Sequence, residues 1–149
     1  MPHEHSVLHN QEIEEFQSLL KDVEKYQSQG VIIPVGDFNA RTADAKDYQI
    51  ITQDTDYTFT NPTVITPRTN IDEKLNKQGK KLLEFCKITG LQIQNGRLNN
   101  QDTYTCYRHN GQSTVDYLLA DKEGLRLISD FRIQPRDVNS DHCALTFSI

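Results

Sequence analysis

The stretch that decides the fold of this chain is Val31-Ile32-Ile33-Pro34-Val35-Gly36-Asp37-Phe38-Asn39-Ala40-Arg41. Its first five residues are apolar and mostly β-branched, which predicts a buried strand. Gly36 permits a turn or the close approach of another backbone. If the extended conformation continues, Asp37 and Asn39 point the same way at the end of that strand, where layered folds often bind ligands. A plain strand followed by an Asx turn is an equally good interpretation of these residues.

The sequence on either side predicts further helices and strands. Apolar residues recur at helical spacing over residues 10–28 and 76–89, and Asn76 and Gly90 suit the two ends of the second helix. Strands are expected over 91–95, 103–107, 113–120, 131–133 and 143–149, with a hairpin turn at Asn110-Gly111. Residues 42–72 lack periodicity and predict a long loop in which acids such as Asp44 and Asp47 are solvated.

Composition limits the class of protein. The chain has 149 residues, 36% of them hydrophobic and 25% charged, which fits one globular domain with a real core. It contains no apolar run of membrane-spanning length, and its N-terminus lacks the pattern of a secretory signal. We therefore expect an intracellular protein, nuclear or cytoplasmic and not secreted, without a membrane partner. Its three cysteines lack metal-site spacing and are expected to be reduced thiols.

The charge pattern neither requires nor excludes a nucleic-acid partner. The net charge is −5, although a local basic patch or a metal ion can still hold phosphate groups. The best basic patch is formed by the lysines of the second helix and its approach: Lys74, Lys77, Lys80 and Lys81. A solvated helix face is the commoner reason for such a run. The same holds for His3 and His5, which could bind a metal but are more often part of a solvated terminus.

Polar side chains occur at three strand ends or strand interiors: Asp37 with Asn39, then Asp116, then Asp141 with His142. Asp116 is predicted inside a strand, where a charge needs a partner unless that face is solvated. Each group is weak evidence alone, but together they supply what phosphoester hydrolysis requires. Asp or His can orient or deprotonate water, and Asn, His and a divalent metal can stabilise the phosphate.

Three motifs occur in the order Gly36-Asp37-Phe38-Asn39, Ser113-Thr114-Val115-Asp116-Tyr117 and Ser140-Asp141-His142. They resemble the last three signature motifs of the endonuclease/exonuclease/phosphatase superfamily, the deoxyribonuclease-I-like fold. With Ala40-Arg41 after the first motif, the chain is most similar to the endonuclease domain of non-LTR retrotransposons and next to apurinic endonucleases. The resemblance implies an α+β fold: half of a four-layer αββα sandwich, with two helices packed on a mainly antiparallel or mixed sheet.

The resemblance also implies a role for each matching residue. Asp37, Asn39, Asp116 and His142 would be catalytic: Asp37 acts on the attacking water, Asn39 binds the scissile phosphate, and Asp116 holds His142 against that phosphate. Asp141, with Asp37, would bind Mg²⁺ or Mn²⁺. The predicted substrate-binding residues are Arg41, Thr105 and Ser140, and the predicted partner is the DNA phosphate backbone.

The same comparison predicts a partial domain. The family begins with motifs carrying an Asn and a metal-binding Glu, which residues 1–149 do not match, so we expect one domain lacking its N-terminal half. A DNA-nicking, metal-dependent phosphodiesterase is the first hypothesis, weak or inactive in this chain by itself. A non-catalytic remnant or binding module is the second, and a phosphatase of small phosphoesters or phosphoinositides the third. An exposed sheet face is expected to bind a complementing N-terminal half or a second copy.

Overall fold

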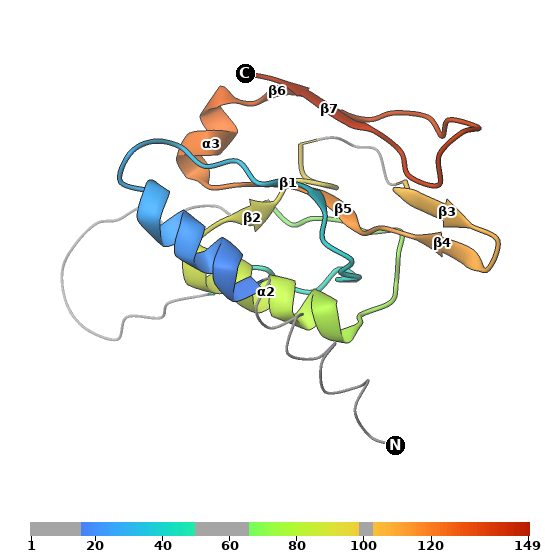
Figure 1. The fold of residues 1–149 in the computed structure, drawn as a ribbon, viewed down its shortest axis with the longest axis horizontal. Helices are drawn as coiled ribbons and strands as arrows, with labels where there is room; N and C mark the ends of the chain where they lie inside the picture. The colour runs from blue at the N-terminus through green and yellow to red at the C-terminus, as the bar shows by residue number, and fades with distance from the viewer. Residues whose placement is uncertain (1–15, 50–65, 99–102) are drawn as a thin grey trace.

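The computed structural model describes residues 16–49, 66–98 and 103–149, which form helices and short antiparallel strands (Figure 1). Residues 16–26 are helical. The elements that follow are β1 (Val35–Asp37), α2 (Lys77–Thr89), β2 (Gln92–Ile93), β3 (Cys106–Arg108), β4 (Gly111–Ser113), β5 (Asp116–Ala120), α3 (Lys122–Leu127), β6 (Ser129–Ile133) and β7 (Leu145–Ser148). The predicted α+β class is confirmed.

Strand β5 is the centre of the fold, because it pairs antiparallel with β1 on one edge and with β2 on the other. All five of its residues are buried, since both faces of the strand are covered. Tyr117 and Leu119 pack with residues 16–26 and α2, whereas Leu118 and Ala120 pack with residues of β6 and β7. Figure 1 shows the helix over residues 16–26 and α2 on one side of this sheet and the β6–β7 pair on the other. The order of layers is therefore helices, sheet, second sheet.

The first turn of α2 is docked directly on the segment that follows β1. The side chain of Asn76 caps the helix by accepting a hydrogen bond from the Gly79 backbone N–H at 2.7 Å, and it also accepts one from the Arg41 N–H at 3.0 Å. Gly79 lies so close that a Cβ atom there would stand 1.8 Å from the Arg41 carbonyl oxygen. The absence of a side chain at Gly79 thus allows α2 to hold the chain just after Asp37 and Asn39.

Two predictions about strands need correction. Val31 and Val35 are 44% and 45% exposed, and β1 begins only at Val35. Within the described part of the chain, β1 is an edge strand that pairs on one side only, with β5. The predicted strand over 113–120 is two strands: β4 pairs with β3, whereas β5 pairs with β1 and β2. The hairpin turn lies at His109-Asn110, one residue before the predicted centre, since Arg108 pairs with Gly111.

The loop prediction also needs correction for Asp47. This residue is 1% exposed, and its carboxylate accepts hydrogen bonds from both terminal nitrogens of Arg97, at 2.6 and 2.8 Å, and from the Ile93 N–H at 2.7 Å. It therefore anchors the loop on β2, whereas Asp44 is exposed as predicted. Residues 50–65 of that loop lie outside the described residues. No helix in the described part of the chain is long and apolar enough to cross a membrane.

Candidate active site

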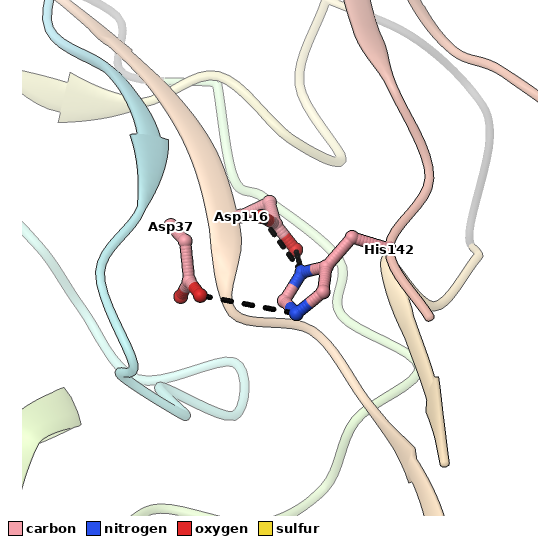
Figure 2. A group of neighbouring side chains, drawn as sticks. All are labelled: Asp37, Asp116 and His142. Carbon is pink, nitrogen blue, oxygen red and sulfur yellow. Dashed lines mark hydrogen bonds and ion pairs between the residues drawn. The ribbon is translucent and has the colours of Figure 1, made fainter. Parts of the chain in front are cut away.

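Three of the predicted catalytic residues meet at one end of the central sheet. Asp37 ends β1 and Asp116 begins β5, and the two are direct partners in the antiparallel register. His142 comes from the segment before β7, which is joined to β3 by an isolated bridge between Cys106 and His142. Figure 2 shows the imidazole of His142 lying between the two carboxylates, with one ring nitrogen toward each. The sheet pairing thus brings together residues from three distant parts of the chain.

The two ring nitrogens of His142 have different environments. Nδ1 lies 2.9 Å and 3.1 Å from the two carboxylate oxygens of Asp116, which accept its hydrogen. Nε2 lies 3.9 Å from Asp37 Oδ2. The Asp116 side chain is 10% exposed, His142 30% and Asp37 37%, so the cluster runs from the interior to the surface. A buried carboxylate on Nδ1 fixes the ring orientation and the tautomer, and it leaves Nε2 as the nitrogen that faces solvent and Asp37.

Thr105 makes hydrogen bonds to the backbone at or beside both Asp116 and His142. Its hydroxyl oxygen accepts hydrogen bonds from the backbone N–H groups of Val115, at 3.0 Å, and Asp116, at 3.1 Å. Its carbonyl oxygen accepts one from the N–H of Cys143, at 2.8 Å. Thr105 is completely buried, so the substrate contact predicted for it has no support in this geometry. The hydrogen bonds of Thr105 instead connect the start of β5, which carries Asp116, to the segment that carries His142.

Asn95 is a buried supporting residue that the sequence interpretation missed. Its side-chain amide donates to the Asp116 carbonyl oxygen at 2.9 Å and accepts from the Leu118 N–H at 3.0 Å. The amide therefore extends the pairing of β2 along the edge of β5 after β2 itself has ended. A signal was present in the sequence, because an Asn that ends a predicted half-buried strand has polar groups that require partners.

The segment after β1 forms the Asx turn that is one interpretation of the opening stretch, and the interpretation as a functional site stays a prediction. Asp37 Oδ1 accepts a hydrogen bond from the Asn39 N–H at 2.8 Å, which is an Asx turn. Asn39 has φ +50°, in the left-handed region that Asn tolerates better than most residues. Asn39 is exposed, and its predicted phosphate contact stays a prediction.

Arg41 lies outside the cluster and is held by Asp72. Its Nε and Nη2 donate to the two Asp72 oxygens at 2.7 and 2.6 Å, and Nη2 also donates to the Gln112 carbonyl at 3.3 Å. Asp72 additionally accepts from the Thr114 N–H, just before β5. Burial alone would raise the pKa of Asp72, but Arg41 and the backbone donors outweigh it and hold that pKa below its usual value. Arg41 is therefore engaged in structure, and its predicted substrate contact stays a prediction.

The Ser140 and Asp141 side chains also lie outside the three-residue cluster. Ser140 Oγ accepts a hydrogen bond from the His142 N–H at 3.1 Å and so shapes the turn before the histidine. The Asp141 carboxylate is 60% exposed and lies 4.0 Å from Arg108 Nε. Their predicted roles, substrate contact for Ser140 and metal binding for Asp141, stay predictions.

A polar cleft of about 690 Å³ adjoins the cluster, between the β3–β4 hairpin and residues 71–74. Asn39 and Cys106 line the end next to His142. The rest of its wall contains three basic side chains, Arg41, Lys74 and Arg108, and two acidic ones, Asp72 and Glu73. Tyr104 adds an aromatic ring. Basic groups beside an aromatic ring suit a phosphate-bearing chain with stacking bases.

The donor atoms of the cluster fit a divalent cation in part. One donor each from Asp37, Asp116 and His142 lie within 4.8 Å of one another. The Asp116 oxygens are already used by His142, which leaves Asp37 as the outward carboxylate, with the exposed Asp141 nearby in sequence. Mg²⁺ and Mn²⁺ favour such oxygen ligands, and Mg²⁺ commonly needs only one or two carboxylates together with water and substrate phosphate.

Comparison with known proteins identifies the class of fold. The endonuclease domain of TRAS1, a telomere-specific non-LTR retrotransposon, superposes with a TM-score of 0.56 at 23% sequence identity. The match covers 90% of this chain but 51% of that domain, so the chain spans about half of its length. The family described as endonuclease-reverse transcriptase matches residues 3–146, and the chain belongs to this family. No curated protein matches the chain.

Proposed function

We propose that this chain is the catalytic-site half of a metal-dependent phosphodiesterase that nicks DNA. The observation that carries the proposal is the arrangement around His142: a buried carboxylate 2.9 Å from Nδ1 and an exposed carboxylate 3.9 Å from Nε2. This places a histidine that can hold or release a proton next to an acid that can orient water. Membership in a family described as endonuclease-reverse transcriptase supports phosphodiester cleavage as the chemistry.

Asp37 and His142 have different proposed roles at the reacting phosphate. Asp37, being the more exposed carboxylate, orients or deprotonates the attacking water. His142 Nε2 contacts a phosphate oxygen, and the Asp116 carboxylate behind it stabilises the positive charge when the ring is protonated. Asn39 donates its side-chain amide to the scissile phosphate from the turn that fixes it beside Asp37. Each role uses the side of the cluster that faces solvent.

The DNA backbone is proposed to follow the adjoining cleft. Arg108 and Lys74 face the substrate across this cleft, whereas the charge of Arg41 is largely balanced by Asp72. A strand of DNA held there would bring a phosphate toward Asn39 at the end of the cleft. The modest number of free basic groups predicts weak binding with a small salt dependence.

Asp37 and Asp141 are the residues proposed to hold Mg²⁺ or Mn²⁺. When bound, the ion would supply positive charge to the phosphate oxygens. A site with so few carboxylates from the described residues predicts low metal affinity. The proposed activity of this chain alone is accordingly weak. A complementing N-terminal half would be expected to raise it, in keeping with the 51% coverage of the structural relative.

The proposal is tested by Mg²⁺-dependent nicking of supercoiled plasmid. Asp37→Ala and His142→Ala should each lower the nicking rate by roughly 10²–10⁴-fold, the usual contribution of a general acid or base. Asp22→Ala is the matched control, because Asp22 is an exposed acid on the helix over residues 16–26. Nicking that persists unchanged in both site variants would refute the assignment of Asp37 and His142.

A second candidate function is a DNA-binding module without catalysis. The coverage of only about half of the structural relative favours it. Under this alternative, the wild-type chain would retard DNA in a salt-dependent manner and produce no nicked plasmid at any Mg²⁺ or Mn²⁺ concentration. Measurement of binding and nicking on the same preparation separates the two functions.

A further inference from the structure

Asp72 is a buried carboxylate whose bonding partners all surround the candidate active site. It is 1% exposed, and its two oxygens accept hydrogen bonds from four donors. Two of the donors belong to the Arg41 guanidinium, and the others are the N–H groups of Lys74, at 3.1 Å, and Thr114, at 2.9 Å. None of the steps proposed for hydrolysis uses this carboxylate. A buried acid whose oxygens are all occupied is a fixed point in the fold.

The bonds of Asp72 connect the two strand ends that carry the acids of the site. Arg41 lies in the segment after Asp37, and Thr114 lies just before Asp116. Arg41, Asp72 and Thr114 therefore form a link between the end of β1 and the start of β5. Asp37 and Asp116 are direct register partners at these same strand ends, so a change in the link is expected to displace both acids.

The guanidinium of Arg41 is held by one edge only. Nε and Nη2 donate to the two oxygens of Asp72 at 2.7 and 2.6 Å, and Nη2 also donates to the Gln112 carbonyl at 3.3 Å. Among the hydrogen bonds between described residues, none uses Nη1 of Arg41. The side chain is 23% exposed and lines the polar cleft. Nη1 is therefore the part of Arg41 that is left for a ligand in that cleft.

Asp72 also determines the charge that Arg41 presents to the cleft. Burial is the largest influence on the pKa of Asp72 and would raise it, but the hydrogen bonds from Arg41 and the backbone hold that pKa below its usual value. The carboxylate is therefore ionised at neutral pH. The same hydrogen bonds raise the pKa of Arg41. The pair as a whole is neutral, so a phosphate in the cleft meets Arg41 as an oriented donor whose charge is already balanced.

We propose that Asp72 is a positioning residue for the reaction on DNA: it holds one edge of Arg41, so that Arg41 contacts a single backbone phosphate through Nη1, and it ties this contact to the start of β5. The inference rests on the proposed function, because it takes DNA as the occupant of the cleft. A phosphate bound by Arg41 is then in a fixed register with Asp116 and with the histidine that Asp116 orients. Asp72 itself does not touch the substrate.

Removal of the Asp72 charge should change binding and turnover in opposite directions. In Asp72→Asn, Arg41 becomes an unbalanced cation in the cleft, so DNA should bind roughly 1.5–5-fold more tightly, the value of one exposed ion pair. The slope of log affinity against log salt concentration should steepen by about 0.7–0.9, the effect of one added phosphate contact. The maximal nicking rate should fall by roughly 10–100-fold, because the bound phosphate and the acids lose their register. A loss of structure alone would weaken both properties.

The test measures DNA binding over a range of salt concentrations and plasmid nicking on the same preparations. A double variant with Arg41→Gln and Asp72→Asn has the net charge of the wild-type chain, so it should return the salt slope to the wild-type value without restoring the rate. Asp44→Asn is the matched control, because Asp44 is an exposed acid that does not line the cleft. Its salt slope and nicking rate should be those of the wild-type chain.

The NMR resonance of the Arg41 Nε–H group tests the same contact in the wild-type chain, should Asp72→Asn fold poorly. The resonance is assigned by its absence in Arg41→Lys. Because Nε keeps Asp72 as its acceptor when Nη1 binds a phosphate, this proton should stay protected from solvent exchange after DNA is added.

Three results would overturn the proposal. They are a wild-type chain that binds no DNA, loss of the Nε–H protection when DNA binds, and a folded Asp72→Asn chain whose salt slope or nicking rate equals that of the wild-type chain. A wild-type chain that binds DNA without nicking it rejects only the proposed function. The salt slope and the Nε–H resonance then still decide the role of Asp72.

Discussion

Replacement of Thr105 by Val tests whether its hydroxyl holds the site together. The two side chains have nearly the same shape, but Val cannot accept the hydrogen bonds that Thr105 Oγ receives from the N–H groups of Val115 and Asp116. Both N–H groups are on buried residues. A buried donor left without a partner costs about 1–3 kcal/mol, so Thr105→Val should lower the free energy of unfolding by about 2–6 kcal/mol.

Thr105→Ser is the matched control, because it keeps the hydroxyl and removes one buried methyl group. Loss of a single buried methyl usually costs about 0.5–1.5 kcal/mol. Urea unfolding of the three proteins measures the difference, and the His142 ring resonances in NMR report whether the hydrogen bond to Asp116 is kept. Equal urea midpoints for the Val and Ser variants, with unchanged His142 resonances in both, would refute the role assigned to Thr105.

Two further predictions concern the pH dependence of stability. The folded state holds the pKa of Asp72 below its unfolded value, so this group stabilises the fold above its unfolded pKa of about 3.9 and the contribution is lost as pH falls through the folded pKa. The free energy of unfolding of the wild-type chain should therefore fall more steeply below about pH 4 than that of Asp72→Asn. Acid unfolding followed by circular dichroism measures this, and the same pH dependence in both proteins would contradict the prediction. Burial raises the pKa of Tyr117 to about 12, so its stabilising contribution is complete below its unfolded pKa of about 10 and is lost as pH rises toward 12. Tyr117→Phe removes the hydrogen bonds to the Ala40 and Thr114 carbonyls, so it should lower the free energy of unfolding by about 1–3 kcal/mol at neutral pH. It should also reduce the loss of stability that the wild-type chain shows at alkaline pH. Thermal melts between pH 7 and 11 measure both effects, and an equal alkaline loss of stability in the two proteins would contradict the second.

The parts of the fold that depend on local chemistry could be predicted from the sequence. Asn76 and Gly90 end α2 as predicted, because capping needs only a side-chain acceptor at one end and a residue tolerant of positive φ at the other. The charge of Asp116 inside a strand predicted a partner, and the structure supplies His142. Alternation likewise predicted β7 and the core of β6.

The parts that depend on tertiary pairing could not be predicted. Val115 N–H and Asp116 N–H bond to a side chain from another strand, and no local pattern in the sequence identifies Thr105 as that acceptor. The change of partner between β4 and β5 interrupts a strand whose alternation is continuous. Helix α3 was missed because it has six residues, too few for a periodic signal, and one of them is Gly124.

The antiparallel pairing of β1 with β5 has a kinetic consequence. The hydrogen bond from the Tyr117 hydroxyl to the Ala40 carbonyl joins residues 77 positions apart, and the Asp37–Asp116 partnership has a similar span. Closing so long a loop lowers the conformational entropy of the chain before the stabilising contacts have formed, and folds rich in such contacts form slowly. The helix α2 and the β3–β4 hairpin are local and can form early, whereas the Asp37–Asp116–His142 cluster exists only once the most distant segments have met. The site is therefore among the last features of the molecule to be completed during folding.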